Sequence, residues 1–93
     1  MTNEKYIADM YLAAALLSYG AKLRNVDRKD KRRQKFYFEN SLPHIWSFNG
    51  TDVKKIPNPT IEEVESEFIG KTLMFPPNYP DSVRSIKSAI HVE

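Results

Sequence analysis

The sequence predicts an α+β protein in which a small antiparallel sheet packs on an N-terminal helix and two C-terminal helices. Apolar residues recur at helical spacing towards both ends of the chain. Between them, short segments alternate apolar and polar residues, as half-buried strands do. The 93 residues correspond to one domain. The expected order of elements is α-β-β-(β-β)-α-α, where the bracketed strands form a second, short hairpin.

Residues 4–19 are expected to form the first helix. Ile7, Met10 and Ala14 recur at helical spacing, and the second half of the segment is apolar on almost every side. A helix of that kind is buried on more than one side. Gly20 stands where a residue of left-handed backbone conformation commonly ends a helix, so the helix is expected to stop there.

A β-hairpin is predicted from two segments, residues 21–26 and 34–39. In the second segment Phe36 and Phe38 alternate with polar neighbours, so we expect both rings to face the core and Tyr37 to face solvent. The first segment alternates weakly, and its phase breaks at the end, which indicates a bulge or the end of the strand. The residues between the segments are polar and mostly basic, so the hairpin is expected to carry a basic tip.

A second hairpin is predicted at roughly residues 45–48 and 51–55. Asn49-Gly50 lies between these segments, and both residue types tolerate the positive φ of a two-residue hairpin turn.

Two helices are expected to close the chain. Thr60 and Glu63 form a capping box at the start of the first, which is expected to end at Gly70. The second is expected to begin at a cap provided by Asp81 or Ser82 and to run to about residue 91. Its inner face is expected to carry Val83, Ile86 and Ile90.

Charge is distributed unevenly along the chain. Residues 22–35 hold eight of the fourteen Lys and Arg residues and two acids, which makes this basic stretch +6 while the whole chain is +2. The remainder is therefore −4, and much of its acid lies at residues 62–67. Such asymmetry indicates an anionic partner or an internal match of opposite charges.

Composition argues against several functional classes. The absence of Cys excludes disulfides, thiolate zinc sites and a cysteine nucleophile. The two His residues lack the spacing of metal ligands, and three Gly residues are too few for a Gly-rich phosphate-binding loop. We therefore expect no metal, no cofactor and no enzymatic activity. No apolar run approaches the ~20 residues that span a bilayer. The N-terminal segment lacks the basic region of a secretory signal, so a cytoplasmic protein without a membrane partner is expected.

The basic stretch beside the aromatic strand is the sharpest functional signal. Cations follow phosphates and aromatic rings stack on bases, so this pattern favours a nucleic acid partner, DNA or RNA. A solvated turn above an inward-facing aromatic strand is the structural alternative. The candidate nucleic-acid-binding residues are Arg28, Lys29, Lys31, Arg32, Arg33, Lys35 and Tyr37.

A second hypothesis is a protein-interaction module that binds or inhibits a host protein. Its candidate surface combines the aromatic Trp46 and Phe48 with the acidic Glu62 and Glu63. A solvated helix face is the simpler explanation of the two acids. The chain is expected to be a monomer or a homodimer, and strand 34–39, if it lies at a sheet edge, would pair across a two-fold axis.

Three blocks of the sequence, residues 9–23, 35–40 and 64–91, resemble a family of small phage and prophage proteins known only as a domain of unknown function. The family pattern is a helix D-x-x-L-A-A-x-L-x-x-x-G, an F-x-F strand and a closing helix with Leu or Ile before Lys-Ser. The positions that fit are Asp9, Leu12, Ala13, Ala14, Leu16, Gly20, Phe36, Phe38, Ile86, Lys87 and Ser88.

This resemblance implies a phage or mobile-element origin inside a bacterial cell, and it brings no known reaction with it. Within the single domain of residues 1–93, residues 41–59 depart from the family pattern and are expected to be an insertion.

Overall fold

The computed structural model describes residues 4–29 and 34–91. In chain order the elements are β1 (Glu4–Ile7), α1 (Met10–Ser18), β2 (Leu23–Asp27), β3 (Lys35–Glu39), β4 (His44–Phe48), β5 (Val53–Pro57), α2 (Ile61–Ile69) and α3 (Tyr79–His91). A three-stranded antiparallel sheet has the order β1-β3-β2, and β4 pairs with β5 in a separate hairpin. The predicted α+β class, with an N-terminal helix and two C-terminal helices, is confirmed.

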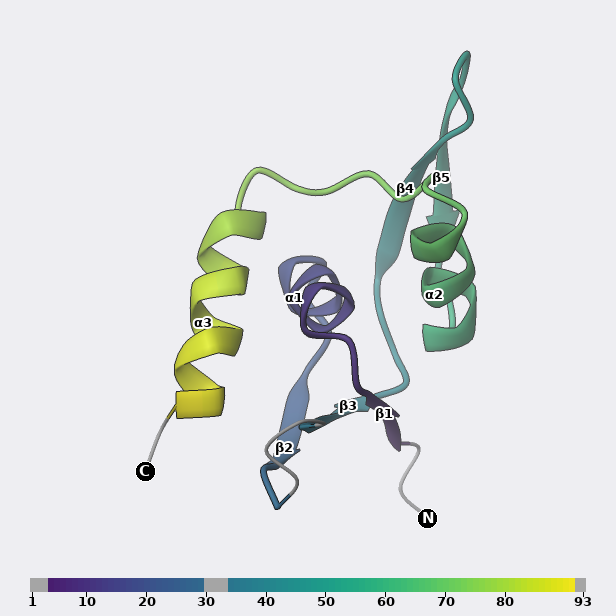
Figure 1. Cartoon of the computed structure of the whole chain (residues 1–93). Coiled ribbons are helices and arrows are strands. Elements are labelled where there is room, and N and C mark those ends of the chain that lie inside the picture. The colour runs from purple at the N-terminus through teal and green to yellow at the C-terminus, as the bar shows by residue number, and fades with distance from the viewer. Residues whose placement is uncertain (1–3, 30–33, 92–93) are drawn as a thin grey trace.

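Helix α1 lies at the centre of the molecule, with the three-stranded sheet below it, α3 on one side, and β4, β5 and α2 on the other (Figure 1). All residues from Leu12 to Leu16 are buried, which confirms that this helix is covered on more than one side. Ala13, Ala14 and Ala15 have short side chains, so neighbouring elements approach the helix closely.

The first element differs from the prediction, because residues 4–7 form strand β1 and not the first turn of a helix. This strand pairs with β3, and Ile7 is buried opposite Phe36. The helix begins after Asp9, whose carboxylate accepts hydrogen bonds from the backbone N–H groups of Tyr11 and Leu12 at 2.8 and 3.1 Å. Local helix propensity is a weak preference that strand pairing overrides here.

Strand β3 lies in the centre of its sheet. Phe36 and Phe38 are buried on the inner face, while Tyr37 lies on the outer face, as predicted. Both edges of β3 are already paired, one with β1 and one with β2. The expectation that this strand pairs with a second copy across a two-fold axis is therefore wrong, because its backbone groups have partners within the chain.

The two hairpins confirm their predicted strands with local differences. In β2 the pairing register shifts between Leu23 and Asn25, so a bulge is present. The β4–β5 hairpin pairs Phe48 with Val53, so its loop has four residues and not the two of a tight turn. The carboxamide oxygen of Asn49 accepts hydrogen bonds from the backbone N–H groups of Thr51 and Asp52, which satisfies the loop backbone.

The helix ends follow recognisable capping patterns. Gly20 has φ +100°, and the N–H of the next residue donates to the carbonyl of Leu16, as in a Schellman motif. The capping box of Thr60 and Glu63 at the start of α2 is confirmed. Helix α2 ends at the predicted Gly70, which is its C-cap residue, and the left-handed conformation falls on the next residue, Lys71.

Helix α3 begins at Tyr79, which is two residues before the predicted cap at Asp81. Its first intrahelical bond runs from the N–H of Ser82 to the carbonyl of Asn78. Ile86 is fully buried on the predicted inner face. Within residues 4–29 and 34–91, no helix has the length and apolar character needed to span a bilayer.

Candidate nucleic-acid interface

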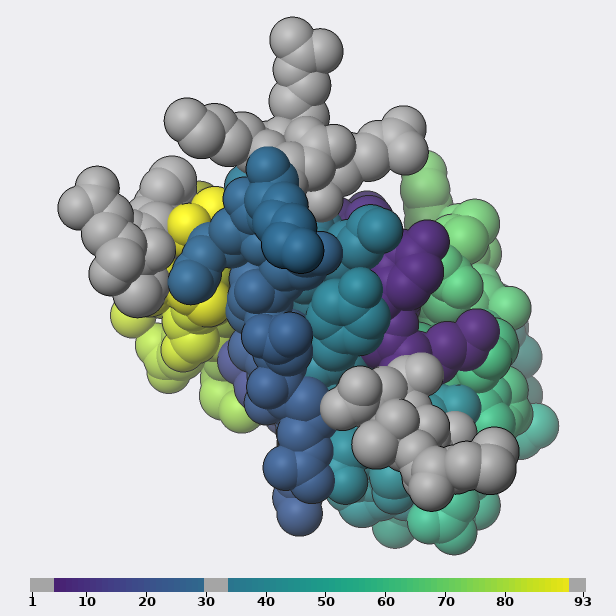
Figure 2. Space-filling view, turned by 90° about the horizontal axis from the view of Figure 1, so that it is seen from below, coloured from purple at the N-terminus to yellow at the C-terminus, as the bar shows by residue number. Residues whose placement is uncertain are grey.

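The outer face of the three-stranded sheet carries two neighbouring tyrosines. Tyr6 on β1 and Tyr37 on β3 are directly opposite in the register, and their ring centroids lie 6.0 Å apart with planes inclined by 50°. Tyr6 is 54% exposed. Figure 2 shows this face, with β3 between β1 and β2. The alternation that buries Ile7 and Phe36 turns the two tyrosines outward.

Cationic side chains surround this tyrosine pair. The Lys35 ammonium lies 5.1 Å from the centroid of the Tyr6 ring, within the range of a cation–π contact. Arg24, at the bulge of β2, forms an ion pair with Glu39 at 2.8 Å. At the end of β2, Arg28 and Lys29 are both exposed.

Arg28 is also tied to the C-terminal part of α3. Its guanidinium Nη1 donates to the backbone carbonyl of Ala89 at 2.5 Å. A cation is favourable near a helix C-terminus, where carbonyl groups lack intrahelical partners. This contact holds the end of β2 against α3 and keeps a positive charge at the rim of the sheet.

Beside Tyr37 lies a polar pocket of about 540 Å³ on the β2 side of the sheet. The residues that line it are Asn25, Val26, Asp27, Arg28, Lys29 and Tyr37. The Asp27 carboxylate accepts a hydrogen bond from the backbone N–H of Lys29 at 3.0 Å, so its orientation is set by the chain itself. The pocket thus combines an aromatic wall, a carboxylate and two cations.

The structure brings four of the predicted nucleic-acid-binding residues to one region, namely Arg28, Lys29, Lys35 and Tyr37. The other three, Lys31, Arg32 and Arg33, lie outside the described residues. Tyr6 was missed because residues 4–19 were expected to be helical. The signal that could have revealed it is Asp9, a strong N-cap residue that favours a later helix start.

In the described part of the chain, no ion pair joins the basic stretch of residues 22–35 to the acidic residues of α2. On α2, Glu62 pairs with Lys5 of β1 at 2.8 Å, and the hydrogen bond from Lys5 lowers the pKa of Glu62. The Glu67 carboxylate accepts hydrogen bonds from the hydroxyl groups of Ser47 and Thr72, and these hydrogen bonds lower the pKa of Glu67. Among described residues of 22–35, the ion pair formed is that of Arg24 with Glu39 on β3.

The alternative protein-interaction surface is divided by the fold. Trp46 and Phe48 on β4 are 39% and 45% exposed. Ser47, between them, points the other way and donates to Glu67 of α2 at 2.5 Å. Because neighbouring strand residues face opposite sides, the two rings point away from α2. The structure therefore does not combine them with Glu62 and Glu63 in one surface.

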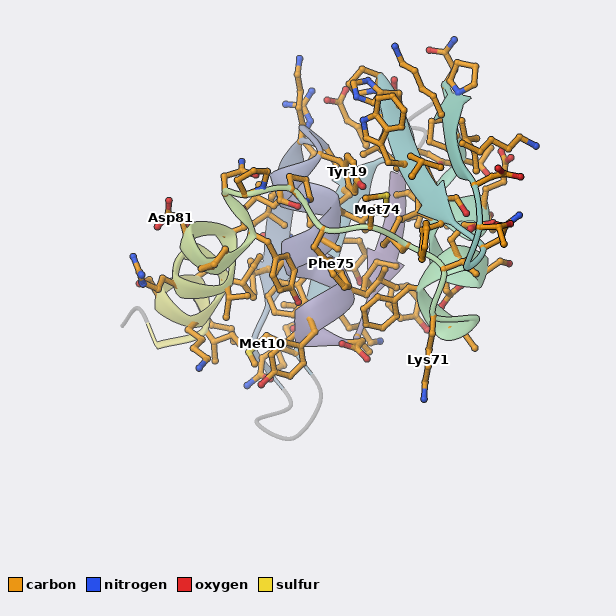
Figure 3. The ribbon with its side chains drawn as sticks, turned by 90° about the horizontal axis from the view of Figure 1, so that it is seen from above. Met10, Tyr19, Lys71, Met74, Phe75 and Asp81 are labelled. Atoms are coloured by element: carbon orange, nitrogen blue, oxygen red, sulfur yellow. The ribbon has the colours of Figure 1, made fainter. Side chains whose placement is uncertain are left out.

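Trp46 instead lines an apolar pocket of about 550 Å³. The connection between α2 and α3 crosses over α1 beside this pocket and contributes Met74 and Phe75 to its wall (Figure 3). This connection also pairs with β4, since the N–H of Met74 donates to the carbonyl of Trp46 at 2.9 Å. His44 contacts the rings of Tyr19 and Trp46 edge-on. Across the described ranges, no group of three or more metal-ligating side chains occurs.

Fold and surface together define a small α+β protein with an aromatic and basic sheet face. Residues 2–45 match a family model described as Domain of unknown function (DUF5659). This match confirms the resemblance to an uncharacterised domain family for that segment, which contains β1, α1, β2 and β3. The tyrosine face lies within the match, whereas α2 and α3 lie outside it. No curated protein and no solved structure matches the chain.

Proposed function

We propose that this chain is a small, non-enzymatic accessory protein of a phage or other mobile element that binds nucleic acid on the outer face of its three-stranded sheet. In this proposal it acts in the cytoplasm of a bacterial host cell. The observation that carries the proposal is the pair of exposed Tyr6 and half-buried Tyr37 on the outer face of the sheet, with Arg28, Lys29 and Lys35 near them. The resemblance to small phage proteins supports the mobile-element origin.

The chemistry of this face suits an extended polynucleotide. Stacking of a base on an aromatic side chain contributes about 1–3 kcal/mol per base and tolerates every base. Two rings 6.0 Å apart on neighbouring strands offer two such platforms. Lys35, Arg28 and Lys29 provide positive charge around them, and neutralised phosphates release counterions, which makes affinity depend on salt.

Tyr6→Leu and Tyr37→Leu are each expected to weaken binding to labelled single strands by roughly tenfold, since each removes one stacking platform. Lys29→Gln is expected to weaken binding to all sequences alike and to reduce the salt dependence. Fluorescence anisotropy with short DNA and RNA strands and with duplexes, over a salt series, measures both effects.

Tyr11→Leu is the matched control. Tyr11 is another exposed tyrosine, but it lies on α1 and not on the sheet face, so its substitution is expected to leave affinity unchanged. Affinity that does not fall as salt rises would contradict the proposal. So would full affinity in the variant that lacks both Tyr6 and Tyr37.

A second candidate function is the protein-interaction module, in which Trp46 and Phe48 bind a host protein. The apolar pocket beside Trp46 favours it, because exposed aromatic rings around a concavity are frequent anchors of protein interfaces.

Trp46→Ser with Phe48→Ser is expected to abolish stoichiometric capture of a host protein in a pull-down from bacterial lysate. The Tyr6→Leu variant is the control and is expected to retain that capture. Recovery of nucleic acid without a stoichiometric protein would count against this second function.

A further inference from the structure

The polar pocket beside Tyr37 has the size and lining of a site for one nucleobase. Its volume of about 540 Å³ lies within the roughly 300–1,000 Å³ that is usual for small-ligand pockets. Tyr37 forms one wall, and Asp27, Arg28 and Lys29 approach from the end of β2. The pocket is therefore continuous with the tyrosine pair on the outer face of the sheet.

The register of the sheet places Asp27 next to the ring of Tyr37. Asn25 is the direct partner of Tyr37, and Asp27 is the direct partner of Lys35, two residues away along β3. Val26 between them packs against the core, so Asn25 and Asp27 share the outer face. Asp27 and Tyr37 are thus diagonal neighbours across the two strands, and the Cα atoms of such neighbours lie about 7–8 Å apart. A base stacked on Tyr37 therefore presents its edge to the Asp27 carboxylate.

The Asp27 carboxylate is oriented before any ligand arrives. It already accepts the backbone N–H of Lys29 at 3.0 Å, and an ionised carboxylate has further acceptor positions but no donor. It is therefore selective for a base edge that consists of donors. The unpaired Watson–Crick edge of guanine presents two adjacent donors, N1–H and the N2 amino group. Uracil and thymine present one N–H between two carbonyl oxygens, which a carboxylate repels.

We propose that this pocket selects guanine in a single strand, with Tyr37 stacking on the base and Asp27 accepting hydrogen bonds from its N1–H and N2 amino group. Arg28 and Lys29 then lie beside the adjoining phosphates. This inference rests on the proposed nucleic-acid function. It excludes a duplex as the preferred ligand, because base pairing occupies the edge that Asp27 binds.

The test uses the full chain and a set of short labelled strands that differ in one central base: guanine, inosine or uracil. The guanine strand is expected to bind roughly tenfold more tightly than the uracil strand, as for a bidentate side-chain contact to a base. Inosine lacks the N2 amino group and is expected to bind with intermediate affinity. This comparison leaves the protein unchanged, so it does not depend on how a variant folds.

Asp27→Asn is expected to abolish the preference for guanine while the uracil strand binds as well as before or better. Asparagine keeps the oxygen that accepts the Lys29 N–H, so the local turn is retained. Asp52→Asn, which removes an exposed acid from the β4–β5 loop, is the charge-matched control and is expected to keep the preference.

Equal affinity for all three strands, or a guanine preference that survives Asp27→Asn, overturns guanine selection. The proposed function still stands in that case, because salt-dependent binding that needs Tyr6 and Tyr37 remains. Absence of salt-dependent binding to every strand is a different result, and it overturns both the proposed function and the selection built on it.

Discussion

Phe38→Ala is expected to lower the free energy of unfolding by about 3–5 kcal/mol. Phe38 is 0% exposed and lies on β3, the central strand, where its ring joins the sheet to the rest of the core. Truncation removes apolar contacts and leaves a cavity that the neighbouring elements fill only in part. Domains are stable by about 5–15 kcal/mol in total, so this loss is a large fraction of the whole. Urea and thermal denaturation, followed by circular dichroism, measure it.

Tyr37→Ala is the control for this substitution. It removes an aromatic ring from the next position of the same strand, but from the outer face of the sheet. Cross-strand pairs on such a face contribute about 0.2–1 kcal/mol relative to alanine, so the loss of stability is expected to be small. Equal losses in the two variants would contradict the assignment of the two faces of β3.

Tyr19→Phe is expected to destabilise the fold by about 1–3 kcal/mol, since it removes two hydrogen bonds to part-buried backbone groups, each of which contributes about 0.5–1.5 kcal/mol. The Tyr19 hydroxyl donates to the carbonyl of Met74 and accepts the N–H of Trp46, so it joins the end of α1 to β4 and to the connection that crosses α1. Figure 3 shows Tyr19 beside Met74.

Two measurements check this substitution. The denaturation midpoint reports the loss of stability, and the emission of Trp46, the single tryptophan of the chain, reports loosening of the surroundings of β4. Tyr79→Phe is the control, because the Tyr79 hydroxyl donates to Tyr11 at the longer distance of 3.3 Å at the surface. An unchanged midpoint and emission spectrum in Tyr19→Phe would show that the hydroxyl contributes nothing to the fold.

The same tyrosine gives the stability a dependence on alkaline pH. Burial raises the pKa of Tyr19 above its ordinary 10.0, while the hydrogen bond from the Trp46 N–H opposes this in part. The folded state thus holds the Tyr19 proton more tightly than the unfolded state. The resulting contribution of Tyr19 to the free energy of unfolding is complete below about pH 10 and is lost as pH rises through the raised pKa. Burial also raises the pKa of Tyr79, so the alkaline loss is expected to be smaller in Tyr19→Phe but not absent.

Local patterns were sufficient to predict most elements. The alternation around Phe36 and Phe38 identified β3 and its buried face, and the capping box of Thr60 and Glu63 identified the start of α2. The predicted position of Gly20 as a left-handed helix end is also confirmed. Each of these features depends on residues close together in the chain, and therefore single-sequence reasoning reaches them.

The candidate site was predicted only in part. Tyr37 and the basic residues of the segment 28–35, which runs from the end of β2 to the start of β3, were identified from composition and alternation. Tyr6 was not, because its segment becomes a strand only by pairing with β3, which lies about thirty residues further along the chain. The separation of Trp46 from Glu62 likewise follows from the packing of α2 on one side of β4.

The sequence by itself determined the α+β class, the inward direction of Phe36 and Phe38, and the concentration of positive charge in residues 22–35. The tertiary structure alone decided that β3 is a central strand, that Tyr6 lies beside Tyr37, and that Asp27 borders the same pocket. The physical reason is that strand order and register arise from contacts between segments distant in the chain. Periodicity specifies which face of each strand is buried, but not which strand lies next to it.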